Sequence, residues 1–218
     1  MSTSDRSQRR AAGERAYEWV KDRILDGRLE GGQLLSEGEA ASALEISRTP
    51  VREAFLRLEV EGLLRLYPKR GALVVPVSAG EVAEVTEARI LLESHAAATV
   101  IARGIQADVA DSMNAVLGDQ RRLDVPKETA AFSRLDRQFH ATLVEAAGNG
   151  LLTQFYSGLH DRQVRMANSA LHRAPSRYGA ILDEHARLCT LLRDSDADGF
   201  REQLAAHIGG THGALLDS

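Results

Sequence analysis

The sequence predicts a mainly α protein in two parts, an N-terminal winged helix-turn-helix followed by an all-α antiparallel helical bundle. Two short amphipathic segments between residues 36 and 60 are separated by a tight turn, and two apolar runs typical of a β-hairpin follow them. From residue 79 onward, apolar residues recur at helical spacing and no segment alternates with period two. A long region with this pattern predicts an antiparallel bundle.

The N-terminal part begins with a helix predicted at residues 10–26, where apolar residues recur at helical spacing. Ser36 and Glu39 then form a capping box, which opens a short helix that runs to about Leu44. Only a two-residue turn separates this helix from the next one. The pair therefore has the layout of a helix-turn-helix.

The helix after this turn carries residues that we expect to contact DNA. Ser47 is suited to an N-cap, and Pro50 is tolerated in a first helical turn. Arg48 and Arg52 are four residues apart, so they project from one side of the helix, where Thr49 adds a hydroxyl group. This half of a recognition helix meets base edges and phosphates. We predict DNA contacts from Ser47, Arg48, Thr49 and Arg52.

Two apolar runs at residues 63–66 and 72–75 are rich in strand formers and predict a hairpin that serves as the wing. Lys69, Arg70 and Gly71 lie in the turn between them. The two cations are either a soluble turn or a wing tip that contacts a DNA groove. We expect the second, with these three residues at the DNA.

The composition is typical of a soluble globular protein, with 218 residues, 44% hydrophobic and 27% charged. No apolar run approaches the ~20 residues of a membrane span. The N-terminus also lacks the apolar core of a signal peptide. We therefore expect a cytoplasmic protein with no membrane partner. The single cysteine, Cys189, lies on an apolar helical face and is interpreted as buried and inert.

The charge balance indicates that any basic DNA-binding surface is confined to a small part of the protein. Residues 1–75 contain 13 Lys or Arg and 12 Asp or Glu, whereas the remainder contains 14 and 19. A sequence pI near 6.0 argues against a protein that coats nucleic acid through a large cationic field. Arg57 and Arg65 are interpreted as solvent-facing charges, since charge on a solvent face is the usual case.

The segment Pro-Val-Ser-Ala-Gly at residues 76–80 breaks the second wing strand and ends the first domain. We assign residues 8–76 to the DNA-binding domain, 77–81 to a linker and 82–216 to an all-α domain. Six helices are predicted after the break, at residues 79–103, 107–121, 126–148, 150–170, 176–194 and 196–214.

Four polar residues fall on apolar faces of these helices. Asp136 and His140 are one helical turn apart, about 40° from each other around the helix axis. His185 and His207 likewise lie within apolar faces of the last two helices. A single buried histidine is more often a hydrogen-bonded core residue than a ligand. Three buried histidines beside a carboxylate cannot easily all find hydrogen-bond partners unless a cation is present. Each buried polar group without a partner costs ~1–3 kcal/mol.

A divalent metal ion would satisfy this group. Three imidazoles and one carboxylate suit Zn²⁺ first, with Ni²⁺ and Mn²⁺ as alternatives, and leave positions open for water or a ligand carboxylate. The other histidines do not converge in this way and are interpreted as surface or ordinary structural residues: His95, His160, His172 and His212.

Arg89 occupies a core position in the apolar stripe of the helix predicted at 79–103. It could reach the bundle edge or pair with an internal acid such as Glu93. Alternatively, its guanidinium could hold an organic acid whose other end reaches the metal, because this group matches a carboxylate bidentately. Arg89 is a candidate effector-binding residue, with both interpretations open.

The first part of the chain, residues 15–76, resembles the DNA-binding domain of the GntR family of bacterial transcription regulators. The motifs that carry the resemblance are Ser-Arg-Thr-Pro-Val-Arg-Glu-Ala at 47–54, Leu-Glu-x-Glu-Gly-Leu at 58–63 and Lys-Arg-Gly at 69–71. Gly31-Gly32 stands where the family usually has Pro-Gly. Gly38 stands where many members carry a basic residue, so we expect one phosphate contact typical of the family to be missing.

The second part, nearly all of residues 80–215, is similar to the metal-binding FCD ligand domain of the FadR-like branch. Its four predicted ligands, Asp136, His140, His185 and His207, carry this resemblance. Six helices rather than seven favour the VanR-like subgroup. The resemblance implies a small carboxylate effector.

These observations predict a ligand-responsive regulator that acts as a homodimeric repressor on an inverted-repeat DNA operator, since two heads double the specific contacts. The alternative is a metal-dependent hydrolase with an accessory DNA-binding head, because an open metal site could activate water. The sequence has no His-Glu-x-x-His string, and Glu184 points about 100° away from His185 on a helix. We therefore expect no enzyme activity.

Overall fold

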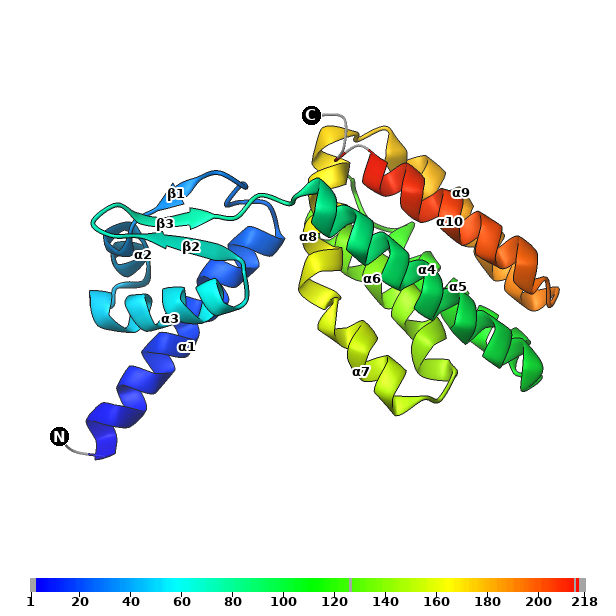
Figure 1. Cartoon of the computed structure of the whole chain (residues 1–218), viewed down its shortest axis with the longest axis horizontal. Coiled ribbons are helices and arrows are strands. Elements are labelled where there is room, and N and C mark those ends of the chain that lie inside the picture. Colours follow the sequence, from blue (N-terminus) through cyan, green and yellow to red (C-terminus); the bar gives the residue numbers. More distant parts are fainter. Residues whose placement is uncertain (1–2, 126, 214, 216–218) are drawn as a thin grey trace. The chain divides into compact units, whose positions relative to one another are not determined.

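The computed structural model describes residues 3–125, 127–213 and 215, and the chain divides into two compact units at Val77 and Ser78. The described residues form ten helices and one three-stranded sheet (Figure 1). This confirms the mainly α fold class. No helix in the described ranges is both long and apolar enough to cross a membrane.

The first unit is a winged helix-turn-helix. Its elements are α1 (Thr3–Leu25), β1 (Leu34–Leu35), α2 (Glu37–Leu44), α3 (Arg48–Val60), β2 (Leu64–Tyr67) and β3 (Gly71–Val74). Strand β3 pairs antiparallel with both β1 and β2, so the wing hairpin is the β2–β3 pair (Figure 1). The sequence did not predict β1, because two residues cannot show an alternation. Helix α1 also starts earlier than the predicted residue 10.

Local signals explain how α2 and α3 begin. Ser36 Oγ accepts a hydrogen bond from the Glu39 amide, and Glu39 Oε2 accepts one from the Ser36 amide, so the predicted capping box is present. Glu45, with φ 55°, then turns the chain between the helices. Ser47 stands at the N-cap of α3, but its side chain makes no capping bond. Ser47 is therefore the N-cap residue, as predicted, although its hydroxyl does not form the capping bond.

The core of the first unit joins all its elements. Val20 of α1, Val51 and Phe55 of α3 and Leu64 of β2 are buried against one another within a single apolar cluster. This packing fixes α3 by its apolar face and leaves the opposite face exposed. The exposed face carries the predicted DNA contacts.

The second unit is an all-α bundle. Its helices are α4 (Ala79–Ala102), α5 (Gln106–Gln120), α6 (Thr129–Ala146), α7 (Gly150–Gly158), α8 (His160–Arg173), α9 (Arg177–Arg193) and α10 (Ala197–Gly213). Helix α4 begins inside the segment predicted as a linker, and Ser78 Oγ caps it by accepting from the Glu81 amide. The segment predicted as one helix at 150–170 is two helices that separate at Leu159. The six-helix count that favoured the VanR-like subgroup was therefore wrong.

The core of the bundle is apolar and contains the single cysteine. Phe139 and Leu143 of α6, Leu188 of α9 and Phe200 of α10 are fully buried in one cluster, to which α4, α5 and α7 also contribute. Cys189 is buried beside them, and burial raises the pKa of its thiol to about 12. The thiolate is therefore not formed at neutral pH, which agrees with the interpretation of an inert residue.

Candidate metal centre and nucleic-acid interface

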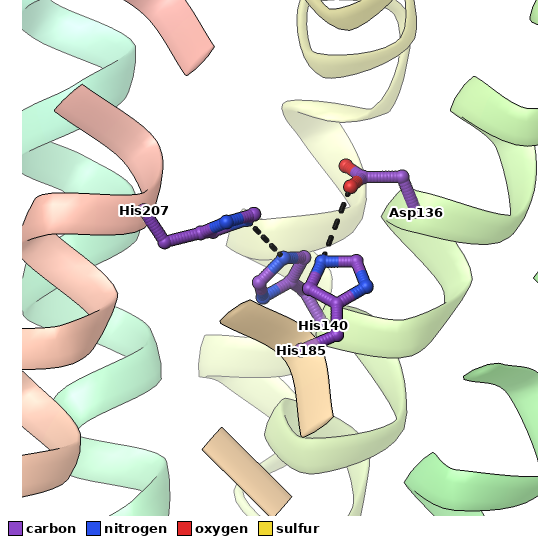
Figure 2. Close-up of side chains that lie close together, drawn as sticks. All are labelled: Asp136, His140, His185 and His207. Atoms are coloured by element: carbon purple, nitrogen blue, oxygen red, sulfur yellow. Dashed lines mark hydrogen bonds and ion pairs between the residues drawn. The ribbon is translucent and has the colours of Figure 1, made fainter. Parts of the chain in front are cut away.

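The structure brings the four predicted metal ligands together. Asp136 and His140 come from α6, His185 from α9 and His207 from α10, and their side chains converge on one point (Figure 2). One ligand atom from each residue lies within 4.8 Å of the ligand atoms of the other three. The i, i+4 spacing on α6 explains why one helix can supply two of them.

All four side chains are buried, with exposed fractions of 6% for Asp136, 0% for His140 and His185, and 2% for His207. Burial lowers the pKa of His140, and it lowers the pKa of His185 to about 3. Burial alone would raise the pKa of Asp136, but the neighbouring imidazoles, with His185 first, hold it well below its usual range. Neutral imidazoles and an ionised carboxylate are the forms that bind a metal.

The outward-facing nitrogens of two histidines are held by hydrogen bonds. His185 Nδ1 lies 2.8 Å from Gln120 Oε1, and His207 Nδ1 lies 2.8 Å from Glu184 Oε2. Both partners are acceptor oxygens, so each Nδ1 carries the proton and donates it. Each Nε2 is left with a lone pair that faces the centre. Outer partners of this kind fix the tautomer of metal-binding histidines.

His140 follows the same pattern less regularly. Its Nδ1 lies 2.7 Å from Glu93 Oε2, which is an ion-pair distance. The carboxylate favours a proton on Nδ1. His140 Nε2 then faces His207 Nε2 at 3.2 Å, and two lone pairs at this distance repel each other (Figure 2). A bound cation would turn this repulsion into attraction.

A further atom at the centre has no hydrogen bond. His185 Nε2 is buried without a hydrogen-bond partner and lies 3.3 Å from Asp136 Oδ1 (Figure 2). An unpaired buried nitrogen beside a carboxylate, together with the facing pair of Nε2 atoms, is difficult to stabilise by protein groups alone. The residues present therefore fit a divalent metal ion held by three Nε2 atoms and one carboxylate.

Sequence reasoning missed the outer partners of the histidines. Glu93, Gln120 and Glu184 each contact one ligand, from α4, α5 and α9. Glu184 does point away from its neighbour His185, as expected, but this direction places its carboxylate against His207. Helical spacing can show that an acid lies on a given face, whereas the residue that it meets depends on how the helices pack.

Arg89 is buried and bonded to Glu93, which was one of its two interpretations. Arg89 Nε donates to Glu93 Oε1 at 2.8 Å, and Tyr156 OH donates to the same oxygen at 2.9 Å. Burial would raise the pKa of Glu93, but Arg89 outweighs it and lowers this pKa to about 2. Arg89 Nη2 remains buried without a hydrogen-bond partner. The pairing with Glu93 therefore leaves one buried donor of Arg89 available.

His212 also lies close to this group. It is buried on α10, and its Nδ1 lies 2.8 Å from Thr86 Oγ1. Burial lowers the pKa of His212 to about 3; the nearby Arg89 lowers it as well, whereas Asp136 opposes the shift. The sequence interpretation of His212 as a surface or ordinary structural residue did not place it near this group, although it follows Leu204 and Ile208 at four-residue spacing on a buried face of α10.

In the first unit, a groove of about 620 Å³ lies between the start of α2, the exposed face of α3 and the wing. Four predicted DNA-contact cations line it: Arg48, Arg52, Lys69 and Arg70. Ser47 and Thr49 are exposed at the start of α3, outside this lining. The structure thus brings the recognition-helix cations and the wing cations to one surface.

The wing turn has an unusual backbone. Lys69 and Gly71 have positive φ angles of 63° and 103°. A Cβ atom at Gly71 would lie 2.5 Å from the Leu35 carbonyl oxygen, because β3 packs against β1 at this point. Packing therefore requires glycine at residue 71 whatever its role at the DNA.

Arg57 belongs to a different surface of α3. Its Nη1 donates to Glu14 Oε2 at 2.7 Å, and its guanidinium lies 3.8 Å from the centre of the Tyr17 ring. Both partners belong to α1. This arrangement supports the interpretation of Arg57 as a residue outside the DNA interface.

Comparison with known proteins identifies the family. Residues 84–210 match the FCD domain, and residues 12–74 match the family described as bacterial regulatory proteins, gntR family. The chain belongs to the GntR family of regulators, in the branch with an FCD domain. The matches cover both units, which agrees with the two resemblances seen in the sequence.

Curated relatives and a solved structure agree with this assignment. The chain is 35% identical over 138 residues to an HTH-type transcriptional regulator from the TAR-I ttuE-ttuC' intergenic region of Agrobacterium vitis, covering 61% of this chain and 78% of the relative. It is 32% identical over 145 residues to the gluconate operon transcriptional repressor of Bacillus subtilis, covering 66% and 58%. A GntR transcriptional regulator from Rhodococcus sp. RHA1 has the same fold, with a TM-score of 0.68, 21% identity and coverage of 95% and 99%.

The family and these relatives are transcription regulators, not enzymes. The expectation of no enzyme activity is therefore confirmed, and the metal-dependent hydrolase is rejected. The described structure agrees, because Glu184, the acid next to His185, is bonded to His207 and Arg177. A metal held by the centre would thus serve structure or ligand binding.

Proposed function

We propose that this GntR-family regulator is a homodimeric repressor that binds an inverted-repeat operator and is released by a small carboxylate bound at a metal ion. The observation that carries the proposal is the buried centre, where three imidazole Nε2 atoms and Asp136 converge while Arg89 keeps an unpaired donor. Because bacterial operators lie in the cytoplasm, the protein acts there.

The donor set favours Zn²⁺ as the resident ion, with Ni²⁺ and Mn²⁺ as alternatives. Imidazole nitrogens suit zinc and nickel, and one carboxylate oxygen is compatible with all three. His140, His185, His207 and Asp136 would hold the ion, and Glu93, Gln120 and Glu184 would orient the imidazoles. The bound ion would supply open positions for an anionic oxygen ligand.

Arg89 is the second group proposed for the effector. Its Nε is occupied by Glu93, but Nη2 is a buried donor without a partner, and such a donor costs free energy until a ligand satisfies it. Glu93 also contacts His140, so the guanidinium is joined to the metal centre through one side chain. A carboxylate is the anion that best matches these two groups.

At the DNA, we assign Arg48, Thr49 and Arg52 of α3 to the major groove and the backbone beside it. Lys69 and Arg70 of the wing are assigned to phosphate or minor-groove contacts. Their common groove supports this assignment, because one duplex could meet both elements. Ser47, exposed at the start of α3, and Gly71, in the wing turn, contribute through their backbone.

A homodimer is supported by exposed apolar side chains on the second unit. Leu91 of α4 and Leu151 and Phe155 of α7 are 69%, 69% and 68% exposed. Leu151 and Phe155 are one helical turn apart, and large exposed apolar groups on neighbouring positions mark interaction surfaces. We assign this face to the contact with a second copy. Phe155→Glu should produce a monomer in analytical ultracentrifugation while the metal content is unchanged.

The test of the proposal combines metal analysis with ligand and DNA binding. The purified protein should contain about one divalent metal ion per chain, and one member of a carboxylate panel should release it from a palindrome selected in vitro. Arg89→Lys keeps the charge beside Glu93 but removes the fork, so it should retain metal and operator binding while calorimetry shows weaker acid binding. A protein that neither contains nor binds Zn²⁺ or Ni²⁺ would contradict the proposed metal site. If the wild type and Arg89→Lys bind the acid with equal affinity, the proposed role of Arg89 would be wrong.

A further inference from the structure

Arg52 is held by an acidic residue from the other helix of the helix-turn-helix. Arg52 Nε donates to Glu37 Oε1 at 2.8 Å, and Arg52 Nη2 donates to Glu37 Oε2 at 3.2 Å. Glu37 is the first residue of α2 and Arg52 is the fifth of α3. The two bonds are parallel, so they restrain both the position and the plane of the guanidinium.

The pair leaves a specific part of Arg52 available. A guanidinium has five N–H groups, and Glu37 engages Nε and one side of Nη2. The edge formed by Nη1 and the other side of Nη2 remains, and two parallel donors of this kind match O6 and N7 of guanine. The Arg52 side chain is 68% exposed, so this edge is accessible to a ligand.

The charge of Glu37 argues against a phosphate as the partner of Arg52. A phosphate that approached the same guanidinium would lie near the Glu37 carboxylate, and like charges at such a distance repel. A guanine edge carries no net charge and does not meet this repulsion. The acid therefore makes Arg52 a poor phosphate ligand and a suitable base ligand.

Arg48 differs from Arg52 although it lies one turn away on the same face of α3. Within the described residues, no ion pair or hydrogen bond of its guanidinium is found, and its Nη2 lies beside Gly38. A Cβ atom at Gly38 would be 3.5 Å from that nitrogen. Residue 38 therefore adjoins the uncompensated charge of Arg48 at the start of α2.

We propose that Glu37 is a positioning residue that orients Arg52 to read one guanine in each operator half-site, whereas Arg48 binds mainly phosphate. The proposal rests on the proposed DNA-binding function and adds that the two arginines of α3 contact different parts of the DNA. It predicts that the two arginines differ in base preference and in salt dependence, not only in affinity.

The experiment uses the full-length protein and an operator selected in vitro with the wild type. Affinities are measured for this operator and for duplexes with each G·C pair replaced in both half-sites. Arg52→Ala should remove discrimination at one G·C pair, about 10- to 100-fold per half-site, with the salt slope unchanged. Arg48→Ala should instead reduce the salt slope by about 0.9 for each phosphate that the side chain neutralises in the wild type.

Glu37→Gln is the decisive variant, and Glu53→Gln is its matched control. Glu53 is an exposed acid on α3, so its substitution removes one negative charge without removing a bond to Arg52. Glu37→Gln should weaken discrimination at the same G·C pair as Arg52→Ala, and the double variant should lose no more than Arg52→Ala alone. Glu53→Gln should leave discrimination at every pair unchanged.

Other outcomes would overturn the proposal. If Glu37→Gln alters a different base pair, Glu37 contacts DNA itself, for example by accepting from cytosine N4. If it strengthens binding to all sequences as Glu53→Gln does, its only effect is charge. A wild-type protein that selects no operator would instead reject the proposed function, so the two failures are distinguishable.

Discussion

The two units of this chain hold their functional polar groups in opposite ways. In the winged helix-turn-helix, Arg48, Lys69 and Arg70 are exposed on a scaffold whose core is separate from them. In the bundle, Arg89 and the four candidate metal-binding side chains are buried in the interior that stabilises the fold. We therefore expect the proposed DNA binding to be separable from folding in the first unit, and the proposed metal and ligand binding to be coupled to folding in the second.

Each unit contains one Arg–Glu ion pair at its proposed functional site, and the two pairs illustrate this difference. In the Arg52–Glu37 pair the side chains are 68% and 26% exposed, and solvent-accessible pairs of this kind contribute about 0–1 kcal/mol to stability. The Arg89–Glu93 pair has side-chain exposures of 5% and 0%, and removing one partner of a buried pair costs about 3–5 kcal/mol. Similar chemistry thus has unequal consequences, because solvent screens only the first pair.

The largest effect is expected from Arg89→Met. The substitution leaves the Glu93 carboxylate buried without its cation, so the bundle should lose about 3–5 kcal/mol of stability. For a chain of this size, the thermal midpoint should fall by about 6–20 °C. Calorimetry measures the loss. The double variant Arg89→Met/Glu93→Gln should recover much of it, and a midpoint within about 2 °C of the wild type in the single variant would show that the pair is not coupled to folding.

Metal removal should give the next largest effect, again in the bundle. An ion present at about 100 times its dissociation constant stabilises the folded state by about 2.7 kcal/mol. The double variant His140→Ala/His207→Ala should lose the ion by elemental analysis and lose this ion-dependent gain in thermal midpoint. His95→Ala is the control, since His95 is exposed on α4. Equal metal content in the double variant and the control would exclude the centre.

These contrasts also explain what the sequence could and could not predict. The residues of α3 and the wing are contiguous, so their spacing alone located Arg48, Arg52 and Lys69. The candidate metal ligands were predicted from helical periodicity, which places Asp136 and His140 on one inner face. The partners Glu93 and Gln120 could not be found in this way, because they meet the histidines only through the packing of different helices.

Secondary structure failed where the local signal was short. Helix α7 ends at Gly158, and Leu159 alone separates it from α8; because a single glycine within a helical pattern is tolerated, one continuous helix was predicted. Strand β1 is two residues long and exists because β3 offers it a partner. Both features depend on tertiary packing, which overrides local propensity.

In the first unit, Arg48→Ala should separate binding from folding. Operator affinity should fall by ~1–3 kcal/mol for each head of the dimer. The free energy of unfolding should stay within about 0.5 kcal/mol of the wild type, as is typical of surface substitutions. Arg57→Ala is the matched control on the same helix: it breaks the ion pair with Glu14 and should leave the operator affinity intact. Loss of stability in Arg48→Ala would contradict the separation of the two properties in this unit.

The smallest effect on operator affinity is expected from substitutions in the wing. The informative result is how this effect depends on DNA sequence and on salt concentration. Lys69 and Arg70 are exposed in the turn between β2 and β3, and within the described residues neither forms an ion pair of the Arg52–Glu37 kind. If they contact phosphates, Lys69→Ala and Arg70→Ala should weaken binding to all sequences by a similar factor. Each substitution should then reduce the slope of log affinity against log salt by about 0.9.

A control for the wing is Arg28→Ala, which removes an exposed cation that pairs with Asp26 outside the groove. It should change neither the affinity nor the salt slope, because that charge is already compensated locally. A wing variant that alters base preference at one position and keeps the full salt slope would assign the wing to base readout. The first unit would then read sequence from two elements, and the exposed cations of the wing would resemble Arg52 rather than Arg48 in their role.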